Sequence, residues 1–186
     1  MKQRIISFNI HEKHSLFFEE EVEKMIDYIL DGHDLSPLFN LDSPSFAFGK
    51  DTEKENVPSF GSIIYTVWDS NDKFLYVGIA GTQKKPVKKR NPRSRIKEHS
   101  SGTRSGDQFC VYVQDFFVLP KIVKSGEYKP SKGYLDKLTK EYIHQNLRYR
   151  VMSFQTEDSV SIVRDLENKI KRGAFEFPPP FLNGLS

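Results

Sequence analysis

Two tyrosines, an arginine and a histidine stand close together in this chain of 186 residues, at spacings that suit chemistry on a phosphate group. Tyr65 and Tyr76 lie in two short apolar runs, and Arg95 and His99 follow a strongly basic segment. An arginine offers a permanently charged fork to a phosphate. A phenol beside a water molecule can accept or relay its proton, and a histidine can share that role or bind phosphate. Together these residue types indicate phosphodiester chemistry.

A β-hairpin is predicted to carry the two tyrosines. Residues 62–68 and 74–78 are rich in β-branched and aromatic side chains, and the polar residues 69–72 separate them as a turn would. If both strands are regular, Tyr65 and Tyr76 face the same side of the hairpin. The alternative is that both are strand aromatics that only pack across the hairpin.

The segment between the hairpin and His99 is a candidate surface for nucleic acid. Residues 84–97 hold eight basic side chains and no acidic one. A short helix is predicted to begin near residues 92–94 and to end by Gly102, which would place Arg95 and His99 one turn apart on the same face. Such a loop suits a phosphate backbone, although alone it is more often a solvated loop. The predicted nucleic-acid-binding residues are Lys84, Lys85, Lys88, Lys89, Arg90, Arg93 and Lys97.

The first third of the chain is predicted to be an extension that precedes the domain with the hairpin and the basic segment. Apolar positions over residues 16–30 recur at helical spacing opposite an acidic face, which predicts a helix. Residues 31–60 contain three prolines and scattered aromatic side chains, typical of a connector pinned to a surface. With a boundary within 50–57, residues 1–58 form an N-terminal helical extension and connector, and residues 59–186 form the main domain.

The rest of the chain alternates between helical and extended patterns. Residues 109–119 are apolar enough to be buried and fit a helix or a strand about equally, with a slight preference for a helix. Residues 135–147 and 157–172 carry apolar side chains at helical spacing, and residues 148–154 alternate as a strand does. The proline-rich tail at 177–183 is predicted to be extended.

Composition narrows the class of protein. Residues 1–60 carry 6 Lys and Arg against 12 Asp and Glu, and the rest of the chain carries 22 against 13, which hints at a polyanionic partner for the second part. The single Cys110 excludes an internal disulfide and a multi-cysteine zinc site. No apolar run approaches a membrane span, and the start lacks the apolar core of a secretory signal. We therefore expect a cytoplasmic protein that does not contact a membrane.

These motifs, taken in order, resemble the GIY-YIG nucleases. Residues 63–65 (Ile-Ile-Tyr) stand where the family has Gly-Ile-Tyr, and residues 76–78 (Tyr-Val-Gly) stand where it has Tyr-Ile-Gly. Arg95 matches the family's arginine, and His99 matches a histidine common in its restriction-enzyme-like branch. Two positions depart from the pattern, because an isoleucine replaces the first glycine and a valine replaces the second isoleucine.

Two further elements extend the resemblance towards the end of the chain. Glu167 lies in an apolar helix preceded by a strand, as the family's single carboxylate does. Residues 180–183 (Pro-Phe-Leu-Asn) match the closing Pro-x-x-Asn, with Asn183 as its last member. The resemblance implies an α/β sandwich with a small three-stranded antiparallel sheet flanked by helices. Its strands would lie near residues 62–69, 73–79 and 149–155.

The resemblance also implies roles for these side chains. Tyr65 is the candidate general base or water-orienting group, and Tyr76 would contact the phosphate or the nucleophile. Glu167 would hold one Mg²⁺ or Mn²⁺ ion per active site, and a single carboxylate suffices because Mg²⁺ takes few protein ligands. Asn183 would hold the geometry of a tyrosine or phosphate. The plainer alternatives are a solvated Glu167, a surface His99 and a turn residue at Asn183.

We therefore expect a divalent-metal-dependent endonuclease that hydrolyses phosphodiester bonds in DNA, most simply duplex DNA. In a restriction-type version, a homodimer would cut both strands, and the helix at 16–30 would serve dimerisation or DNA clamping. Three alternatives stay open: an RNA nuclease, a nucleic-acid-binding module that kept the fold and lost hydrolysis, and an unrelated α/β interaction protein.

Overall fold

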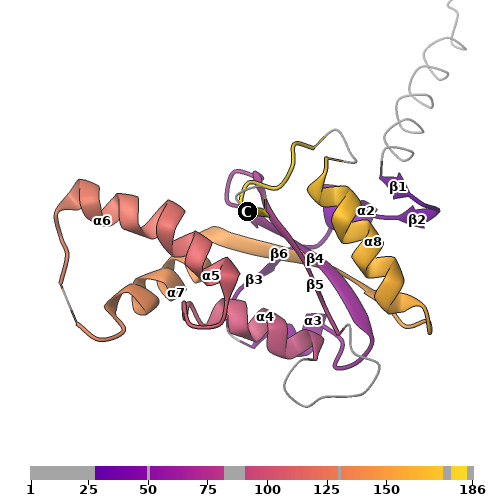
Figure 1. Cartoon of the computed structure of the whole chain (residues 1–186), viewed down its shortest axis with the longest axis horizontal. Helices are drawn as coiled ribbons and strands as arrows, with labels where there is room; N and C mark the ends of the chain where they lie inside the picture. Colours follow the sequence, from indigo (N-terminus) through magenta and orange to yellow (C-terminus); the bar gives the residue numbers. More distant parts are fainter. Residues whose placement is uncertain (1–27, 50, 82–90, 130, 174–176, 184–186) are drawn as a thin grey trace, which may run out of the picture.

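The computed structural model describes residues 28–49, 51–81, 91–129, 131–173 and 177–183. They form a mixed α/β architecture in which an antiparallel sheet lies between two layers of helices (Figure 1), as the expected fold class requires. None of the helices in these residues is long and apolar enough to cross a membrane.

The main sheet has four strands in the order β3-β6-β4-β5, and every neighbouring pair is antiparallel. The strands β4 (Ser62–Asp69), β5 (Phe74–Ala80) and β6 (Leu147–Phe154) confirm the three that were predicted. The fourth strand, β3 (Phe46–Ala47), corrects the expected three-stranded sheet. It was missed because two residues carry no periodic pattern. Phe46 joins the sheet through its pairing with Tyr149.

The turn of the β4–β5 hairpin is built from the predicted polar residues. The Asp69 side chain accepts hydrogen bonds from the backbone N–H groups of Asn71 and Lys73, at 2.8 and 2.9 Å. Asp72 takes the left-handed conformation, with φ of 56°, which aspartate tolerates better than most residues. This turn sets a register in which Tyr65 lies directly opposite Gly78.

Each face of the sheet closes its own hydrophobic core. On one face, α4 (Pro92–Ser100), α5 (Gln108–Val113) and α7 (Tyr134–Asn146) cover a core that contains Tyr65 and packs against Tyr76. On the other face, α2 (Ser36–Phe39) and α8 (Ser159–Lys171) cover a core that is rich in aromatic rings. The two tyrosines therefore share one face, as the hairpin pattern predicted.

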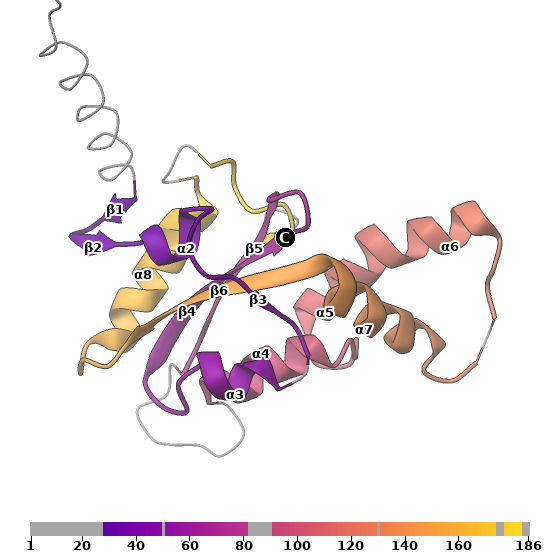
Figure 2. The ribbon, with the colours of Figure 1, turned by 180° about the vertical axis from the view of Figure 1, so that it is seen from behind.

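The predicted helices of the second half are present. Residues 109–119 are helical: α5 continues through a π-helical turn, η1 (Gln114–Val118), into α6 (Leu119–Ser125). The helices α7 and α8 match the predicted 135–147 and 157–172 within two residues at each end. Figure 2 shows α6 and α7 as a helical arm that extends away from the sheet.

The N-terminal part differs from the predicted helix over 16–30. Its last residues form β1 (Ile29–Leu30), which pairs with β2 (His33–Asp34), while residues 16–27 lie outside the described part of the chain. The reason is the Asp31-Gly32 pair, because both residues adopt positive φ, as a two-residue hairpin turn requires. This local turn outweighs the helical spacing of the apolar side chains.

The connector is more structured than its composition suggested. It holds α2, β3 and a second short helix, α3 (Thr52–Asn56). Leu38 and Phe39 of α2 are fully buried in the core under α8, and Val57 is buried in the core under α4. The boundary at residue 58 stays a prediction, yet side chains from before it complete both cores.

Candidate active site

Three of the predicted site residues meet on the face of the sheet that α4 covers. Tyr65 comes from β4, Tyr76 from β5 and His99 from α4. The ring centroids lie 6.3 Å apart for the two tyrosines, 5.6 Å for Tyr65 and His99, and 5.9 Å for Tyr76 and His99. Residues separated by up to 34 positions in the sequence thus form one compact cluster.

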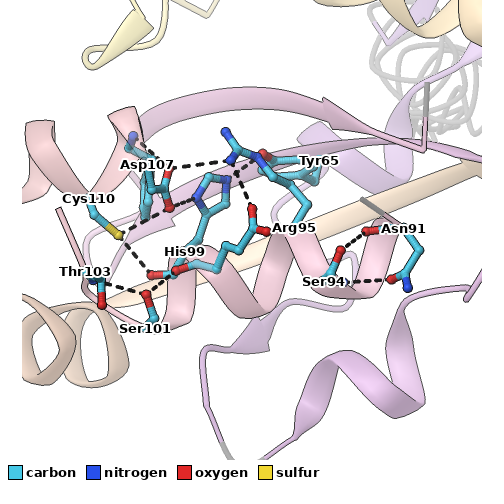
Figure 3. A network of polar contacts seen from close by, with 11 residues as sticks. Tyr65, Asn91, Ser94, Arg95, His99, Ser101, Thr103, Asp107 and Cys110 are labelled. Atoms are coloured by element: carbon cyan, nitrogen blue, oxygen red, sulfur yellow. Dashed lines mark hydrogen bonds and ion pairs between the residues drawn. The ribbon is translucent and has the colours of Figure 1, made fainter. Parts of the chain in front are cut away.

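Helix α4 is held in place by its own N-terminal cap. The Asn91 side chain accepts a hydrogen bond from the Ser94 N–H at 2.8 Å, and Pro92 occupies the first helical position. The helix then presents Arg95 and His99 one turn apart, as the sequence predicted. Both point towards the sheet (Figure 3).

A chain of hydrogen bonds runs through the buried part of this cluster. The Tyr65 hydroxyl lies 2.6 Å from Nε2 of His99, and Nδ1 of the same ring lies 2.6 Å from Oδ2 of Asp107 (Figure 3). Tyr65 and His99 have no exposed surface, and Asp107 is 5% exposed. The three side chains therefore form a tyrosine–histidine–carboxylate array shielded from bulk water.

Burial decides the protonation states of this array. It lowers the pKa of His99 because the imidazolium is disfavoured away from water, although Asp107 opposes the shift. It also raises the pKa of Tyr65 well above its usual value. Burial likewise raises the pKa of Asp107, but the His99 hydrogen bond and the Arg95 positive charge act against it, and the net shift is downward. A neutral imidazole thus lies between a protonated phenol and an ionised carboxylate.

Arg95 connects the array to a pocket of about 630 Å³. Its Nη1 lies 3.8 Å from Oδ1 of Asp107 and 3.4 Å from Oε2 of Glu98, and its side chain is 29% exposed. The guanidinium is close enough to both tyrosines to lower the pKa of each hydroxyl, against the effect of burial. The pocket is lined by Ile79, Ala80, Gly81, Ser94, Arg95, Glu98, Ser101, Thr103, Ser105, Gly106 and Asp107.

Gly78, the glycine of the Tyr-Val-Gly motif, makes room for the tyrosines. A Cβ atom at this position would lie 2.4 Å from the Tyr65 hydroxyl oxygen and 2.8 Å from Cε1 of Tyr76. Its φ is not positive, so the requirement is one of space and not of backbone conformation. Steric exclusion by the two tyrosines therefore explains why a glycine stands at this position, which the sequence alone does not reveal.

Glu167 approaches the cluster from the other layer of helices. It lies on α8, 15% exposed, and its Oε1 is 3.0 Å from the Lys171 ammonium. Burial is the main reason that the pKa of Tyr76 rises to about 12, and the negative charge of Glu167 adds to the increase. The carboxylate is therefore within electrostatic reach of Tyr76. Because β5 is an edge strand, groups from both faces can meet beside it.

The donor chemistry at Glu167 fits a hard divalent cation. The described residues contain no group of three or more His, Cys, Asp or Glu side chains placed to hold a metal. This excludes a closed cage within that part of the chain, but Mg²⁺ commonly binds through one or two carboxylates, several waters and substrate phosphate. A single, partly exposed carboxylate is consistent with that mode of binding.

Asn183 acts on the backbone of β5. Its Oδ1 accepts a hydrogen bond from the Val77 N–H at 2.7 Å, and its Nδ2 donates to the Val77 carbonyl at 3.0 Å. The Leu182 N–H donates to the Leu75 carbonyl beside it. Asn183 thus fixes the strand at the residue next to Tyr76.

The predicted basic surface is only partly described. Lys84, Lys85, Lys88, Lys89 and Arg90 lie outside the described residues. Arg93 donates from Nε to the Val57 carbonyl at 2.7 Å, so it ties α4 to the segment before the sheet. Lys97 is exposed on α4, where a phosphate could reach it.

Sequence reasoning missed Asp107, the third member of the buried array. It stands at the end of a polar, Gly- and Ser-containing segment, where acidic residues are ordinarily solvated. One signal was available: an aspartate directly before an apolar helical run is a typical N-cap, and the Phe109 N–H does donate to its Oδ1 at 3.1 Å. Its contact with His99, eight residues earlier, depends on how α5 folds back onto α4.

A scan of the chain against protein-family models, and searches of curated proteins and of solved structures, found no match. The resemblance to the GIY-YIG nucleases therefore rests on the motif residues and on the geometry described above.

Proposed function

We propose that this chain is a GIY-YIG-type endonuclease that hydrolyses phosphodiester bonds in DNA with the help of one divalent metal ion. One observation carries the proposal. Tyr65, Tyr76 and His99, placed on three different elements, form one cluster beside Arg95, which lines a polar pocket, and Glu167 is within electrostatic reach of Tyr76. An accidental match of short motifs gives no reason for such convergence.

Arg95 is the phosphate-binding residue in this proposal. It lines the pocket, it is partly exposed, and its guanidinium keeps its charge at any physiological pH. A bidentate contact with phosphate oxygens would stabilise the negative charge that grows in the transition state. Its ion pairs with Asp107 and Glu98 help to hold the side chain in place.

Tyr65 and His99 move the proton. The attacking water oxygen forms the new P–O bond while the bond to the leaving oxygen breaks. The water's proton passes to the Tyr65 oxygen as the Tyr65 proton passes to Nε2 of His99. When the product leaves, the proton returns from Nε2 through the Tyr65 hydroxyl to water in the pocket, and the leaving oxygen takes its proton from solvent. Because the pKa of Tyr65 is raised by burial, an adjacent acceptor such as His99 is needed.

Glu167 is the residue that would hold the metal ion, which when bound would supply positive charge beside the scissile phosphate. The carboxylate is 3.0 Å from the ammonium of Lys171, one turn further along the same helix. Asn183 keeps β5, and hence Tyr76, in place during the reaction.

The test is cleavage of supercoiled plasmid in the presence of Mg²⁺ or Mn²⁺, comparing wild type with Glu167→Gln. We expect metal-dependent nicking or linear product from wild type, and a loss of at least about 10²-fold in the variant because the ion is no longer held. Asp165→Asn is the matched control, since this carboxylate lies on the same helix and pairs with Lys169 in solvent.

Other outcomes would replace the proposal. Binding of DNA without cleavage by either protein, measured by fluorescence anisotropy in low salt, would favour a module that lost hydrolysis. Cleavage of RNA but not DNA under the same conditions would favour an RNA nuclease.

A further inference from the structure

The carboxylate of Asp107 receives hydrogen bonds from three different donors while almost wholly buried. Its Oδ1 accepts from the Phe109 N–H at 3.1 Å. Its Oδ2 accepts from Nδ1 of His99 at 2.6 Å and from the Cys110 thiol at 3.3 Å. One oxygen therefore caps α5, and the other faces the imidazole ring.

The chemistry of a carboxylate settles which nitrogen of His99 carries the proton. An ionised carboxylate can only accept hydrogen bonds, so Nδ1 must be the protonated nitrogen at a distance of 2.6 Å. In a neutral ring, Nε2 then keeps its lone pair and can accept from the Tyr65 hydroxyl. The opposite tautomer would place the Nδ1 lone pair against a carboxylate oxygen with no proton between them.

We propose that Asp107 is a positioning residue of the active site, which fixes the Nδ1–H tautomer and the ring orientation of His99 so that Nε2 accepts the Tyr65 proton. The consequence for catalysis rests on the function proposed above, whereas the tautomer does not. When the proton reaches Nε2, the imidazolium that forms lies beside the Asp107 negative charge. The carboxylate thus stabilises the charged intermediate without taking the proton itself.

A purely structural role for Asp107, as the cap of α5, would explain the contact of Oδ1 but not the contact of Oδ2 with His99. Capping α5 uses Oδ1, and serine or asparagine could do the same. The short contact to His99 uses Oδ2 and needs a group that accepts but cannot donate. Arg95, 3.8 Å from Oδ1, further favours the ionised carboxylate.

The variant Asp107→Asn separates the two roles. Its amide oxygen must take the place of Oδ1, because the Phe109 N–H points there. The amide nitrogen then faces Nδ1 of His99 as a donor and forces the proton onto Nε2, which can no longer accept from Tyr65. We expect the helix cap and the melting temperature to be nearly kept, and DNA cleavage to fall at least about 10²-fold.

The direct readout is the tautomer of His99, measured by ¹⁵N NMR of the imidazole ring in wild type and Asp107→Asn. We expect protonated Nδ1 in wild type and protonated Nε2 in the variant. The control variant is Asp115→Asn. Asp115 lies on η1 and pairs with Arg104, so this change should alter neither the tautomer of His99 nor DNA cleavage.

Two results would overturn the inference: protonated Nε2 in the wild-type ring, or full cleavage activity by folded Asp107→Asn. The wild-type spectrum decides the tautomer even if the variant fails to fold. If wild type cuts no nucleic acid while its ring carries the proton on Nδ1, then the proposed function fails and the positioning geometry stands.

Discussion

The side chains on the two faces of strand β4 differ in the groups that they contact. Ile64, Thr66 and Trp68 point towards α2 and α8, where rings and aliphatic side chains close the core. Tyr65 points the other way, into the core under α4 and α5, where its hydroxyl meets His99, which in turn bonds to Asp107. Both faces are equally buried, so burial alone does not mark the functional one.

The polar groups on the two faces show the difference. On the α8 face, the Trp68 indole donates to the Thr66 hydroxyl at 2.8 Å, and this hydroxyl donates to the Leu38 carbonyl. That set ends on the backbone, and the buried Arg150, whose guanidinium lies over the Trp68 ring, likewise donates to backbone carbonyls. On the α4 face, the set consists of side chains that can each exchange a proton, and Arg95 links it to the pocket. The polar groups on the α8 face can therefore only stabilise the fold, whereas those on the α4 face can also transfer protons.

The largest expected effect is on stability, from Trp68→Ala. The indole is fully buried and packs against the rings of Phe39, Phe74 and Phe177. Its removal should lower the free energy of unfolding by about 3–5 kcal/mol in urea denaturation. Cleavage per folded molecule should stay within about threefold of wild type, since the indole packs on the face of the sheet opposite Tyr65 and His99. A large loss of activity in fully folded protein would show that the faces are coupled.

The opposite result, a large loss of cleavage with a small loss of stability, is expected for Tyr65→Phe. This variant keeps the ring and its packing but removes the hydroxyl that meets Nε2 of His99. Cleavage should fall at least about 10²-fold in single-turnover measurements. The free energy of unfolding should fall by no more than about 1–3 kcal/mol, because one buried nitrogen loses its partner. Unchanged cleavage would remove Tyr65 from the reaction and leave it as a packing residue.

An intermediate effect is expected for Gly78→Ala, which forces the tyrosines to move. The added Cβ would lie 2.6 Å from Cζ of Tyr65 as well as 2.4 Å from its oxygen. We expect a loss of about 1–3 kcal/mol in stability together with a loss of cleavage. In the Tyr65→Phe background, the stability loss should be smaller, because the closest atom is gone. Equal losses in both backgrounds would mean that the glycine serves the backbone and not the tyrosines.

The elements that could be predicted from the sequence are those with long, regular patterns. The apolar runs of β4 and β5 and the helical spacing of α7 and α8 each extend over many residues, so local preference and tertiary context agree. Strand β3 and the β1–β2 hairpin could not be predicted in this way. They are two-residue strands whose pairing depends on a partner far away or on a single turn, such as Asp31-Gly32.

The residues of the candidate site also differ in whether a local sequence pattern predicts them. Tyr65, Tyr76, Arg95 and His99 could be predicted to lie together because each stands in a motif with a chemical reason for its spacing. Asp107 was missed because its role appears only when a loop brings it onto a histidine, a contact that no local pattern encodes. Arg93 was chosen for its charge, and the structure gives it a structural contact as well, since its Nε donates to the Val57 carbonyl.

The smallest expected effect is the dependence of stability on pH, and it belongs to the α4 face alone. The folded-state pKa of His99 is lowered by burial, so below its ordinary pKa of 6.5 the unfolded chain binds a proton that the native ring does not. The unfolded state then holds more protons, and stability falls as pH falls, by up to about 1.4 kcal/mol per pH unit. The charged or titratable groups around this ring are Tyr65, Tyr76, Arg95, Glu98, Asp107 and Cys110.

Asp107 acts in the same direction but in a lower range. Its folded-state pKa is also lowered, so its contribution is present above about pH 3.8 and is lost as pH falls through the folded-state value. Urea denaturation between about pH 5 and pH 7 therefore isolates His99. His99→Gln should flatten the slope in that range. Val163→Ala, which only removes apolar contacts under α8, should lower stability equally at every pH and keep the wild-type slope. If His99→Gln kept the full slope, the acid sensitivity would have to arise from the other face or from the surface.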